Sequence, residues 1–354
     1  MQDCTKLYVH DITWQSRAAR LHPAGERATL YICHACSALC LSIPKIVSNA
    51  KKYGQRIDMS AFEDYQKVCK YYDEFRYPIG AETELRELCR LGKPLKDVHI
   101  ADIGCGTGNY SKYFLDNGVG KVSMFDGSEG MLSYAKTKVA DYVAEGRVSH
   151  CETLQLPNPL PDGQQYDVIC MNFVLHHLGS PDDDASTRTF PKATAALRNI
   201  YASLKSGGHF ILLTCLKPQL KTSMWYHGLI DDLDSIFEAP IMDLAYGDYS
   251  TLEKTLKGIG FDKMEATVPL HETLMKPVHY YNIDAVFDPK FLQADSTFTL
   301  LRNRSKNSGS NETDALHQRL RKLKESNKAE AFMERQEELR RTYGCATVIT
   351  ARKP

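Results

Sequence analysis

The strongest constraint on the fold of this 354-residue chain is a regular alternation of apolar strands and helical segments between residues 81 and 214. Short apolar runs alternate with stretches whose leucines and alanines recur at helical spacing. The run over 166–173 is nearly all apolar, as expected for a strand buried on both faces of a parallel sheet. The sequence therefore predicts a doubly wound α/β sheet of about seven strands, with helices on both faces.

The individual elements follow from periodicity and from glycine or proline stops. Helices are expected over 81–91, 109–117, 130–145 and 192–204, and strands over 98–103, 122–125, 148–151, 166–173 and 209–214. Beyond 215 we expect one helix over 223–237, another behind a Ser250–Glu253 capping box, and strands over 263–269 and 345–351. We also expect a loop over 303–311 and a charged, solvated helical segment over 312–341.

These patterns divide the chain into four parts. They are an N-terminal extension (1–57), the α/β core (58–215), a cap or insertion with late core elements (216–343) and a final core strand (344–354). The segment 216–343 is far longer than the two to six residues that α/β loops usually need. We therefore expect an insertion that covers the substrate.

Composition excludes some classes of protein. Lysine plus arginine equals aspartate plus glutamate at 44 each, so no overall basic charge favours a nucleic-acid partner. No stretch approaches the ~18 apolar residues of a membrane span, and the first thirty residues lack the pattern of a signal peptide. We expect a cytoplasmic protein and predict nothing about its oligomeric state. Of the eleven cysteines, Cys33, Cys36 and Cys40 could form half of a zinc site, but no second pair has ribbon spacing, so we expect no metal.

The glycine-rich turn after the expected strand 98–103 is the main candidate ligand site. Gly104, Gly106 and Gly108 are spaced G-x-G-x-G, and the third glycine of a dinucleotide G-x-G-x-x-G would fall on Asn109. Asp102 stands two residues before the first glycine, where it would repel a diphosphate. The turn thus favours a ligand that has no phosphate and carries a cationic group.

Acidic residues after the next two strands are candidate contacts to a nucleoside. Asp126 follows the turn by roughly twenty positions, where a ribose-binding carboxylate belongs. Glu152 and Thr153 follow a short strand, and Glu152 could accept a hydrogen bond from the exocyclic amine of adenine. The alternative for Glu152 is a simple loop carboxylate.

Three polar residues come at the end of the strand over 166–173. Asn172, His176 and His177 should lie at the carboxyl end of the sheet, where open α/β folds bind ligands. A histidine there could take a proton from an acceptor. It could equally pack or form a structural hydrogen bond.

Together these blocks resemble the class I S-adenosylmethionine (SAM)-dependent methyltransferases, in particular the broad type 11 small-molecule branch. The resemblance rests on Asp102–Gly108, Asp126, Phe173–Leu178 and Leu204–Gly208, and Tyr71-Tyr72-Asp73 resembles the upstream tyrosine that often closes over SAM in this branch. Asp-Ala is commoner in the family where this chain has Glu152-Thr153. The match covers about 65–215 well and the last strand loosely.

The resemblance implies a Rossmann-like fold, SAM as co-substrate, and displacement at the sulfonium methyl group, which depends mainly on positioning and desolvation. The acceptor is not identified by the sequence. The cofactor-binding residues that the resemblance implies are Tyr72, Asp102, Gly104, Cys105, Gly106, Gly108, Asp126, Gly127, Ser128, Met131, Glu152, Thr153 and Asn172.

The aromatic-rich segments 225–237 and 279–291 are expected to fold over the SAM methyl group. His279, Tyr280 and Tyr281 would then be among the groups closest to the substrate, and Tyr281 joins His176 and His177 as a candidate catalytic residue. The alternatives are that these aromatics form a plain core or a dimer interface.

Two other functions compete with small-molecule methylation. Nucleic-acid and protein-amide N-methyltransferases often carry an Asn/Asp-Pro-Pro-aromatic block after the fourth strand, whereas this strand ends Met171-Asn172-Phe173-Val174. A SAM-binding regulator without turnover would keep the same glycine turn, because that turn reports cofactor binding alone. We expect an enzyme with a small-molecule acceptor.

Overall fold

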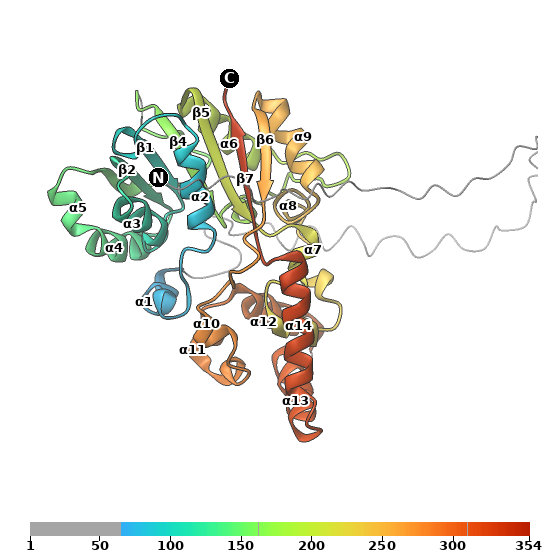
Figure 1. Ribbon diagram of the computed structural model, residues 1–354. Helices are drawn as coiled ribbons and strands as arrows, with labels where there is room; N and C mark the ends of the chain where they lie inside the picture. Colours follow the sequence, from blue (N-terminus) through green and yellow to red (C-terminus); the bar gives the residue numbers. More distant parts are fainter. Residues whose placement is uncertain (1–64, 162, 310) are drawn as a thin grey trace, which may run out of the picture. The chain divides into compact units, whose positions relative to one another are not determined.

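The centre of the molecule is a seven-stranded mixed sheet, seen in a computed structural model that describes residues 65–161, 163–309 and 311–354 (Figure 1). The strands are β1 (His99–Ile103), β2 (Lys121–Asp126), β3 (Val148–Thr153), β4 (Tyr166–Asn172), β5 (Leu204–Thr214), β6 (Asp262–Thr267) and β7 (Thr347–Arg352). Their order is β3-β2-β1-β4-β5-β7-β6. Strands β1 to β5 are parallel, and β7 lies antiparallel between β5 and β6. The expected doubly wound α/β sheet is confirmed. The extension 1–57, with Cys33, Cys36 and Cys40, lies outside the described residues.

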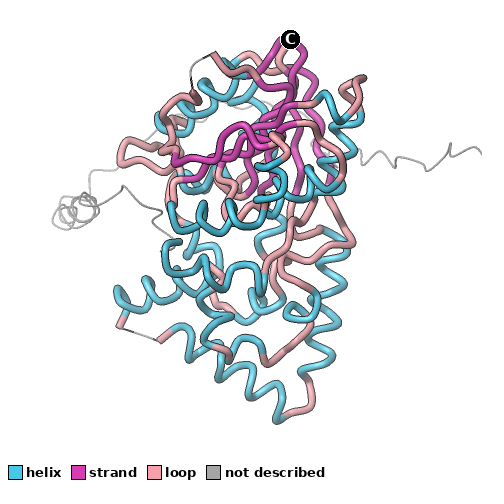
Figure 2. Tube along the Cα trace, turned by 90° about the vertical axis from the view of Figure 1, so that its left-hand side faces the viewer, coloured by secondary structure: helices cyan, strands magenta, loops and turns pink. Residues whose placement is uncertain are grey.

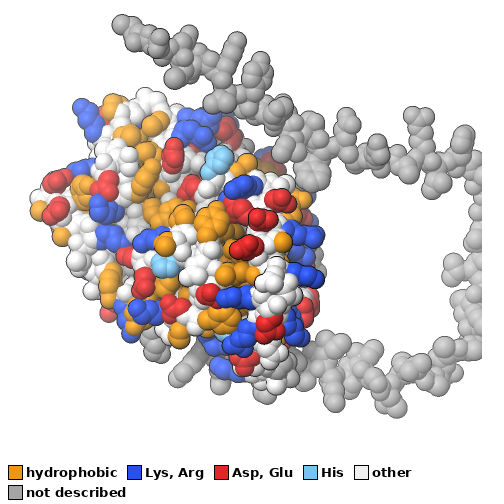
Figure 3. All heavy atoms as spheres, turned by 60° about the horizontal axis from the view of Figure 1, so that its bottom comes forward, with side chains coloured by type: hydrophobic (Ala, Val, Ile, Leu, Met, Phe, Trp, Pro, Cys, Tyr) orange, Lys and Arg blue, Asp and Glu red, His pale blue; other side chains and the backbone are white. Residues whose placement is uncertain are grey.

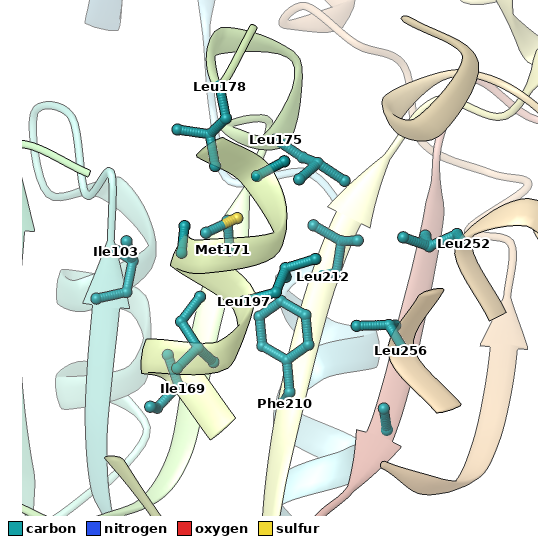
Figure 4. Packing of buried hydrophobic residues seen from close by; sticks show 14 of the residues in the cluster. Ile103, Ile169, Met171, Leu175, Leu178, Leu197, Phe210, Leu212, Leu252 and Leu256 are labelled. Atoms are coloured by element: carbon teal, nitrogen blue, oxygen red, sulfur yellow. The ribbon is translucent and has the colours of Figure 1, made fainter. Parts of the chain in front are cut away.

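Helices cover both faces of the sheet, as the all-apolar strands require. One face is covered by α2 (Ala81–Cys89), α3 (Asn109–Asp116) and α4 (Glu129–Lys138), and the other by α6 (Pro191–Ser203), α8 (Ile241–Ala245) and α9 (Tyr249–Ile259). Figure 4 shows Leu197 of α6 and Leu252 and Leu256 of α9 packed near Phe210 on the second face. Each such buried side chain contributes about 1.5–3 kcal/mol, so the two layers fix the sheet between them.

A helical cap lies beyond the carboxyl ends of the parallel strands, and Figure 2 shows its helices gathered at one end of the described molecule. It is built from α7 (Lys217–Leu220), η4 (Trp225–Leu229), η5 (Leu233–Phe237), α10 (Pro277–Tyr280), η6 (Ala285–Phe287), α11 (Pro289–Gln293), α12 (Ser296–Ser308), α13 (Glu312–Glu325) and α14 (Ala329–Tyr343). Its core is aromatic, with Trp225, Tyr226, Tyr280, Phe291 and Phe298 all fully buried. Helix α1 (Tyr65–Phe75) contacts both α4 and α11 and so joins the cap to the core.

Several cap elements differ from the sequence-based expectation. The helix expected over 223–237 is instead two 3₁₀ segments, η4 and η5, and Asp232 between them has a left-handed backbone with φ of 48°. Gly228 lies so close to Gln336 of α14 that a Cβ would be 2.6 Å from its Nε2. Tertiary packing therefore sets the local backbone here, whatever the helical periodicity favours.

The prediction of a loop over 303–311 is also wrong. Most of it belongs to α12, whose N-cap Asp295 accepts a hydrogen bond from the Thr297 N–H and whose C-cap is Gly309. The capping box expected at Ser250 does not form either. Helix α9 begins at Tyr249 after an N-cap, Asp248, whose side chain makes no capping hydrogen bond.

The single helical segments expected over 130–145 and 312–341 are each divided. Helix α4 is followed by a separate α5 (Ala140–Ala144), and α13 and α14 are separated at Asn327, whose φ is 55°. Most of the charges of 312–341 are solvated, as expected, although Arg340 of α14 is buried. Helix α13 buries Leu316 and Leu320, and Figure 3 shows acidic and basic side chains interspersed on the outer face of the cap. Among the helices that the structure describes, none is long and apolar enough to cross a membrane.

Candidate active site

A cavity of about 280 Å³ lies between the carboxyl ends of the strands and the cap. Its sheet side is lined by Ile103, Phe125, Asp126, Asn172 and Cys215 with the loops that follow these strands, and its cap side by Leu220, Ser223, Met224, His227, Phe237, Leu274 and residues 294–297. The volume is close to the lower end of the ~300–1,000 Å³ of small-molecule sites. This is the position at which open parallel sheets bind ligands.

The glycine turn forms one wall of this cavity. Gly104, Gly106 and Gly108 have φ values of 70°, 54° and 81°, the left-handed region that only glycine adopts without strain. A Cβ on Gly104 would lie 2.2 Å from Val174 Cγ2, whereas a Cβ on Gly106 would meet no atom within 4 Å. Gly104 thus permits close packing of the protein, and Gly106 leaves open space for a ligand.

Asp126 ends β2 and lines the same wall. Its Oδ2 accepts a hydrogen bond from the Gly106 N–H and its Oδ1 accepts one from the Ser128 N–H, both at 2.8 Å. Burial raises the pKa of the Asp126 carboxyl, and these two hydrogen bonds oppose that effect. Each oxygen retains acceptor capacity, so the carboxylate is oriented to receive the two hydroxyls of a ribose.

Asn172 ends β4 and presents a buried amide to the cavity. Its Nδ2 donates to Glu84 Oε2 of α2 at 3.3 Å, and among the described residues its buried Oδ1 has no hydrogen-bond partner. Burial raises the pKa of Glu84 to about 8, so this side chain is mostly protonated at neutral pH. Glu84 therefore orients the amide, leaving a carbonyl oxygen for a cationic amino group of the ligand.

His176 and His177 lie in η3 (Leu175–His177), just after β4, and both line the cavity. The two rings are tilted by 45° to one another with centroids 3.8 Å apart, and the His176 ring also packs on Tyr246 at 5.0 Å. Burial lowers the pKa of His176 well below its usual range and that of His177 to about 4. Both are neutral at physiological pH. Phe173 before them has a left-handed φ of 55°, a strained conformation for an aromatic residue.

The upstream tyrosine, Tyr72, lines the cavity as the resemblance implies. The next residue, Asp73, was not identified from the sequence. Its carboxylate accepts hydrogen bonds from Thr107 Oγ1 at 2.5 Å and from Asn109 Nδ2 at 2.9 Å, and pairs with Lys138 Nζ at 2.7 Å. Asp73 thus ties α1 to the glycine turn and to α4.

Glu152 and Thr153 do not line the cavity. The Glu152 side chain is 53% exposed and pairs with His150 at 2.7 Å. The reason is that β3 runs to Thr153, two residues past the expected end, so the loop at the carboxyl edge starts later. Leu154, Gln155 and Leu156 occupy the cavity wall instead.

Three other residues implied by the resemblance support the turn from behind. Asp102 is buried and accepts a hydrogen bond from Ser111 Oγ at 2.6 Å, and burial raises its pKa to about 6. Cys105 packs in the core on the α3 face of the sheet, and Gly108 is the N-cap of α3. The structure places none of the three in the cavity lining, whereas Gly127, Ser128 and Met131 do line it.

The cap contributes residues other than those expected. His227 and Phe237 from the segment 225–237 line the cavity, but no residue of 279–291 does. The Tyr281 ring is 49% exposed, and its hydroxyl donates to Glu337 of α14 at 3.1 Å. His279 instead packs on Phe75 with ring centroids 4.7 Å apart. The structure therefore does not bring Tyr281 to the cavity, because α10 faces α1 and α14.

Four polar residues on the cap side were missed from the sequence. They are Arg76, His227, Asp295 and Thr297, and all line the cavity, as do the hydroxyl-bearing Ser223 and Ser296. The available signal was the Asp295-x-Thr297 pattern, which is typical of a helix N-cap within a region expected to cover the substrate.

Comparison with known proteins agrees with this geometry. Residues 101–210, from β1 to β5, match the family model described as a methyltransferase domain. This chain is a class I SAM-dependent methyltransferase. SAM is its co-substrate, and the expectation of a small-molecule methyltransferase is confirmed.

The methyltransferase is 25% identical over 226 residues to a demethylmenaquinone methyltransferase of Leptospira interrogans, a match that covers 57% of this chain and 85% of the relative. It is 31% identical to the demethylmenaquinone methyltransferase of Symbiobacterium thermophilum over 167 residues, covering 44% and 59% of the two chains. Among solved structures it is similar to phosphoethanolamine N-methyltransferase 2 of Haemonchus contortus, with 16% identity, a TM-score of 0.46, and coverage of 84% of this chain and 61% of the other.

Proposed function

We propose that this methyltransferase acts on a small, largely apolar acceptor that carries a hydroxyl on an aromatic ring, of the phenol or quinol kind. The observation that carries the proposal is the composition of the cap side of the cavity. Leu220, Met224, Phe237 and Leu274 make an apolar wall, and a few polar side chains are grouped at Asp295 and Thr297. Such a surface suits a flat apolar body with one hydrogen-bonding group.

The sequence relatives support this choice of acceptor. Both curated relatives described above are named for demethylmenaquinone, whose reduced form is an aromatic quinol. The cap side of the cavity has the apolar surface that such a molecule needs. A cavity of about 280 Å³ beneath a cap also favours a small molecule over a folded RNA or protein. The absence of a nucleic-acid partner and the cytoplasmic location remain predictions from the sequence. The oligomeric state remains open.

The residues of the sheet side would bind and orient the donor. Asp126 would hold the ribose hydroxyls, Asn172 Oδ1 would accept from the amino group of the methionine end, and Gly106 would leave space for that end. When bound, SAM supplies an activated methyl group, so the protein contributes mainly alignment and exclusion of water. The neutral rings of His176 and His177 would form the floor on which the acceptor is oriented.

A transfer assay tests the proposal. Purified protein is incubated with methyl-labelled SAM and, separately, with 1,4-naphthohydroquinone, simple phenols, total RNA and denatured protein. We expect label in the quinol or phenol product and demethylated cofactor in equal amount. Label in RNA or protein would overturn the proposed acceptor class, and so would cofactor binding without transfer to the quinol or the phenols. Asp126→Ala is the matched control, because it should lose cofactor binding and hence transfer.

A further inference from the structure

We infer that Thr297 and His227 form the pair that takes the proton from the acceptor hydroxyl, and that Asp295 and Arg76 are positioning residues for this pair. The inference deepens the proposed function and rests on an acceptor with an ionisable hydroxyl. It concerns residues of the cap and Arg76, which follows α1, and all of them lie outside the part of the chain matched by the family model.

The hydrogen bonds of His227 fix which ring nitrogen carries the proton. Nδ1 lies 2.6 Å from the carbonyl oxygen of Leu220, and because a carbonyl only accepts, Nδ1 must donate. In the neutral ring Nε2 is then the acceptor, and it lies 3.1 Å from Thr297 Oγ1. The Thr297 hydroxyl therefore donates to His227 and keeps its lone pairs for another donor. Both side chains line the cavity, so an acceptor hydroxyl can be that donor.

Thr297 is held in place by the start of α12. Its N–H donates to Asp295 Oδ1 at 2.8 Å, and Asp295 Oδ2 pairs with Arg76 Nη2 at 3.1 Å. Arg76 also donates to the Ala294 carbonyl at 3.0 Å and to the Leu274 carbonyl at 3.3 Å. The Asp295 side chain is 3% exposed, and a buried pair with additional hydrogen bonds has a well-defined geometry.

The charges around His227 suit a base that is neutral before the reaction. Burial lowers its pKa, and the Asp295 carboxylate opposes that effect. The other groups that face it are Tyr226, whose ring lies edge-on at 5.3 Å, and Ser223, whose Oγ is 3.3 Å from Nδ1. Arg76 pairs with Asp295 at 3.1 Å. An imidazolium formed at His227 would thus be stabilised by a nearby buried carboxylate.

His176 and His177 are the rival bases in the same cavity. At His176 burial and the neighbouring His177 both lower the pKa, and at His177 burial and Lys192 both lower it. At neither ring do these causes include a carboxylate that raises the pKa, whereas Asp295 raises the pKa of His227. Because a general base works best when its pKa is near the working pH, His227 is the better proton acceptor.

The step balances without any further reactant. The acceptor O–H donates its proton to Thr297 Oγ1 while the Thr297 hydroxyl proton passes to His227 Nε2. The electron pair released on the acceptor forms the new bond to the SAM methyl carbon, at oxygen or at a ring carbon made nucleophilic by ionisation. The carbon–sulfur bond breaks, its pair stays on sulfur, and demethylated SAM leaves. His227 then releases its proton to solvent. When the methyl group is transferred to a ring carbon, the hydrogen on that carbon is also lost to solvent as a proton, which restores the aromatic ring.

A binding experiment tests the proton transfer without turnover. The protein is saturated with demethylated SAM, which has no methyl group to transfer, and 4-nitrophenol is added, because its anion absorbs visible light. In wild type we expect the bound phenol to ionise about one to three pH units lower than with Thr297→Val, the usual effect of a neighbouring opposite charge. Thr297→Ser keeps the hydroxyl and should behave like wild type. Thr297→Val keeps the backbone N–H to Asp295, and a wild-type melting temperature confirms that it folds.

The outcomes separate the inference from the proposed function. If 4-nitrophenol binds and ionises alike in wild type and Thr297→Val, the proton pair is overturned while the phenol-type acceptor stands. If neither 4-nitrophenol nor other phenols bind, the proposed acceptor class fails, and this inference fails with it.

Turnover of 1,4-naphthohydroquinone gives the second measurement. Thr297→Val and His227→Gln should each lower kcat by about 10²-fold or more, the usual contribution of a general base, with SAM affinity unchanged. In wild type kcat should fall at acid pH as His227 becomes protonated, and in both variants it should instead rise steadily with pH as the free acceptor ionises. A variant that keeps the wild-type pH profile would contradict the role.

Discussion

Gly104 and Gly106 have similar left-handed backbones, yet their surroundings assign them different roles. A Cβ at Gly104 would clash with Val174, so substitution there should unfold or distort the turn. A Cβ at Gly106 meets only the open cavity, so beyond the strain of its left-handed backbone the cost of substitution falls on the ligand. A residue-scale experiment can separate the two effects.

We predict that Gly106→Ala lowers SAM affinity at least ten-fold while the protein still folds. The physical reason is that the alanine side-chain methyl group would occupy space that the cofactor needs. Gly92→Ala is the matched control, since Gly92 has a φ of 73°, no neighbour within 4 Å of a built Cβ, and no place in the cavity lining. Isothermal titration measures affinity and thermal unfolding measures stability. Equal SAM affinity in the two variants would show that Gly106 does not face the ligand.

The burial of Glu84 makes the stability of the protein depend on pH. Its pKa is raised from 4.5 to about 8 in the folded protein, chiefly by burial. The folded state therefore prefers the protonated form. The contribution to stability is complete below the unfolded pKa of 4.5 and is lost as pH rises through about 8.

We predict that wild type loses stability relative to Glu84→Gln between about pH 5 and pH 9, by up to a few kcal/mol at the alkaline end. Glutamine is a neutral isostere of the protonated acid and retains an oxygen to accept from Asn172. Denaturant unfolding of the two proteins at a series of pH values measures the difference. Glu82→Gln, an exposed change on the same helix, is the control. A difference that stays constant with pH would disprove the raised pKa.

At the scale of elements, α14 holds the segment that leads from β6 into the cap. Arg340 of α14 is 2% exposed, forms a two-pronged pair with Glu337, and donates to the carbonyl oxygens of Leu270 and Glu272 at 2.8 and 2.7 Å. Arg341, the next residue, also pairs with Glu337 at 2.9 Å, but its side chain is 70% exposed. The two arginines share a partner and differ in burial.

We predict that Arg340→Met destabilises the protein by about 3–5 kcal/mol, because Glu337 and two carbonyl oxygens would lose a buried donor. Arg341→Met should cost no more than about 1 kcal/mol, since an exposed pair is screened by water. Chemical denaturation measures both values. Similar losses in the two variants would mean that the buried hydrogen bonds to Leu270 and Glu272 add nothing.

At the scale of the whole molecule, the cavity joins two layers that are distant in the chain. The donor side comes from β1 to β4 and the acceptor side from η4, η5 and the start of α12, while Tyr72 and Arg76, in and just after α1, contribute to both. A ligand that fills the donor side should therefore stabilise the folded molecule as a unit.

We predict that SAM and its demethylated product raise the melting temperature by several degrees, and that NAD does not. At a ligand concentration of about 100 times Kd the expected stabilisation is about 2.7 kcal/mol. The turn has the G-x-G-x-G spacing, and the buried Asp102 beside it would repel a diphosphate. A thermal-shift assay with all three ligands is sufficient, and Gly106→Ala serves as a control that should respond more weakly to SAM. Stabilisation by NAD without SAM would contradict the cofactor assignment.

The donor side could be predicted from the sequence because its signals are local. The alternation of strands and helices, the glycine spacing and Asp126 all lie within one contiguous stretch, and the ends of parallel strands necessarily meet at one edge. Asn172, His176 and His177 reach the cavity for the same reason. Glu152 was misplaced because the end of β3 depends on pairing with β2, which extends to Thr153.

The acceptor side was decided by tertiary structure alone. Arg76, His227 and Asp295 are far apart in sequence, and no short-range pattern connects them. They meet because the aromatic core of the cap packs Tyr226 of η4 on Phe298 of α12, and because Arg76 bridges from the end of α1 to Asp295. Tyr281 lies in an aromatic-rich segment, as a pocket residue would, yet it faces Glu337 on the outside. Which side of a short helix faces a cavity depends on the helices packed around it, and that information is spread over the whole chain.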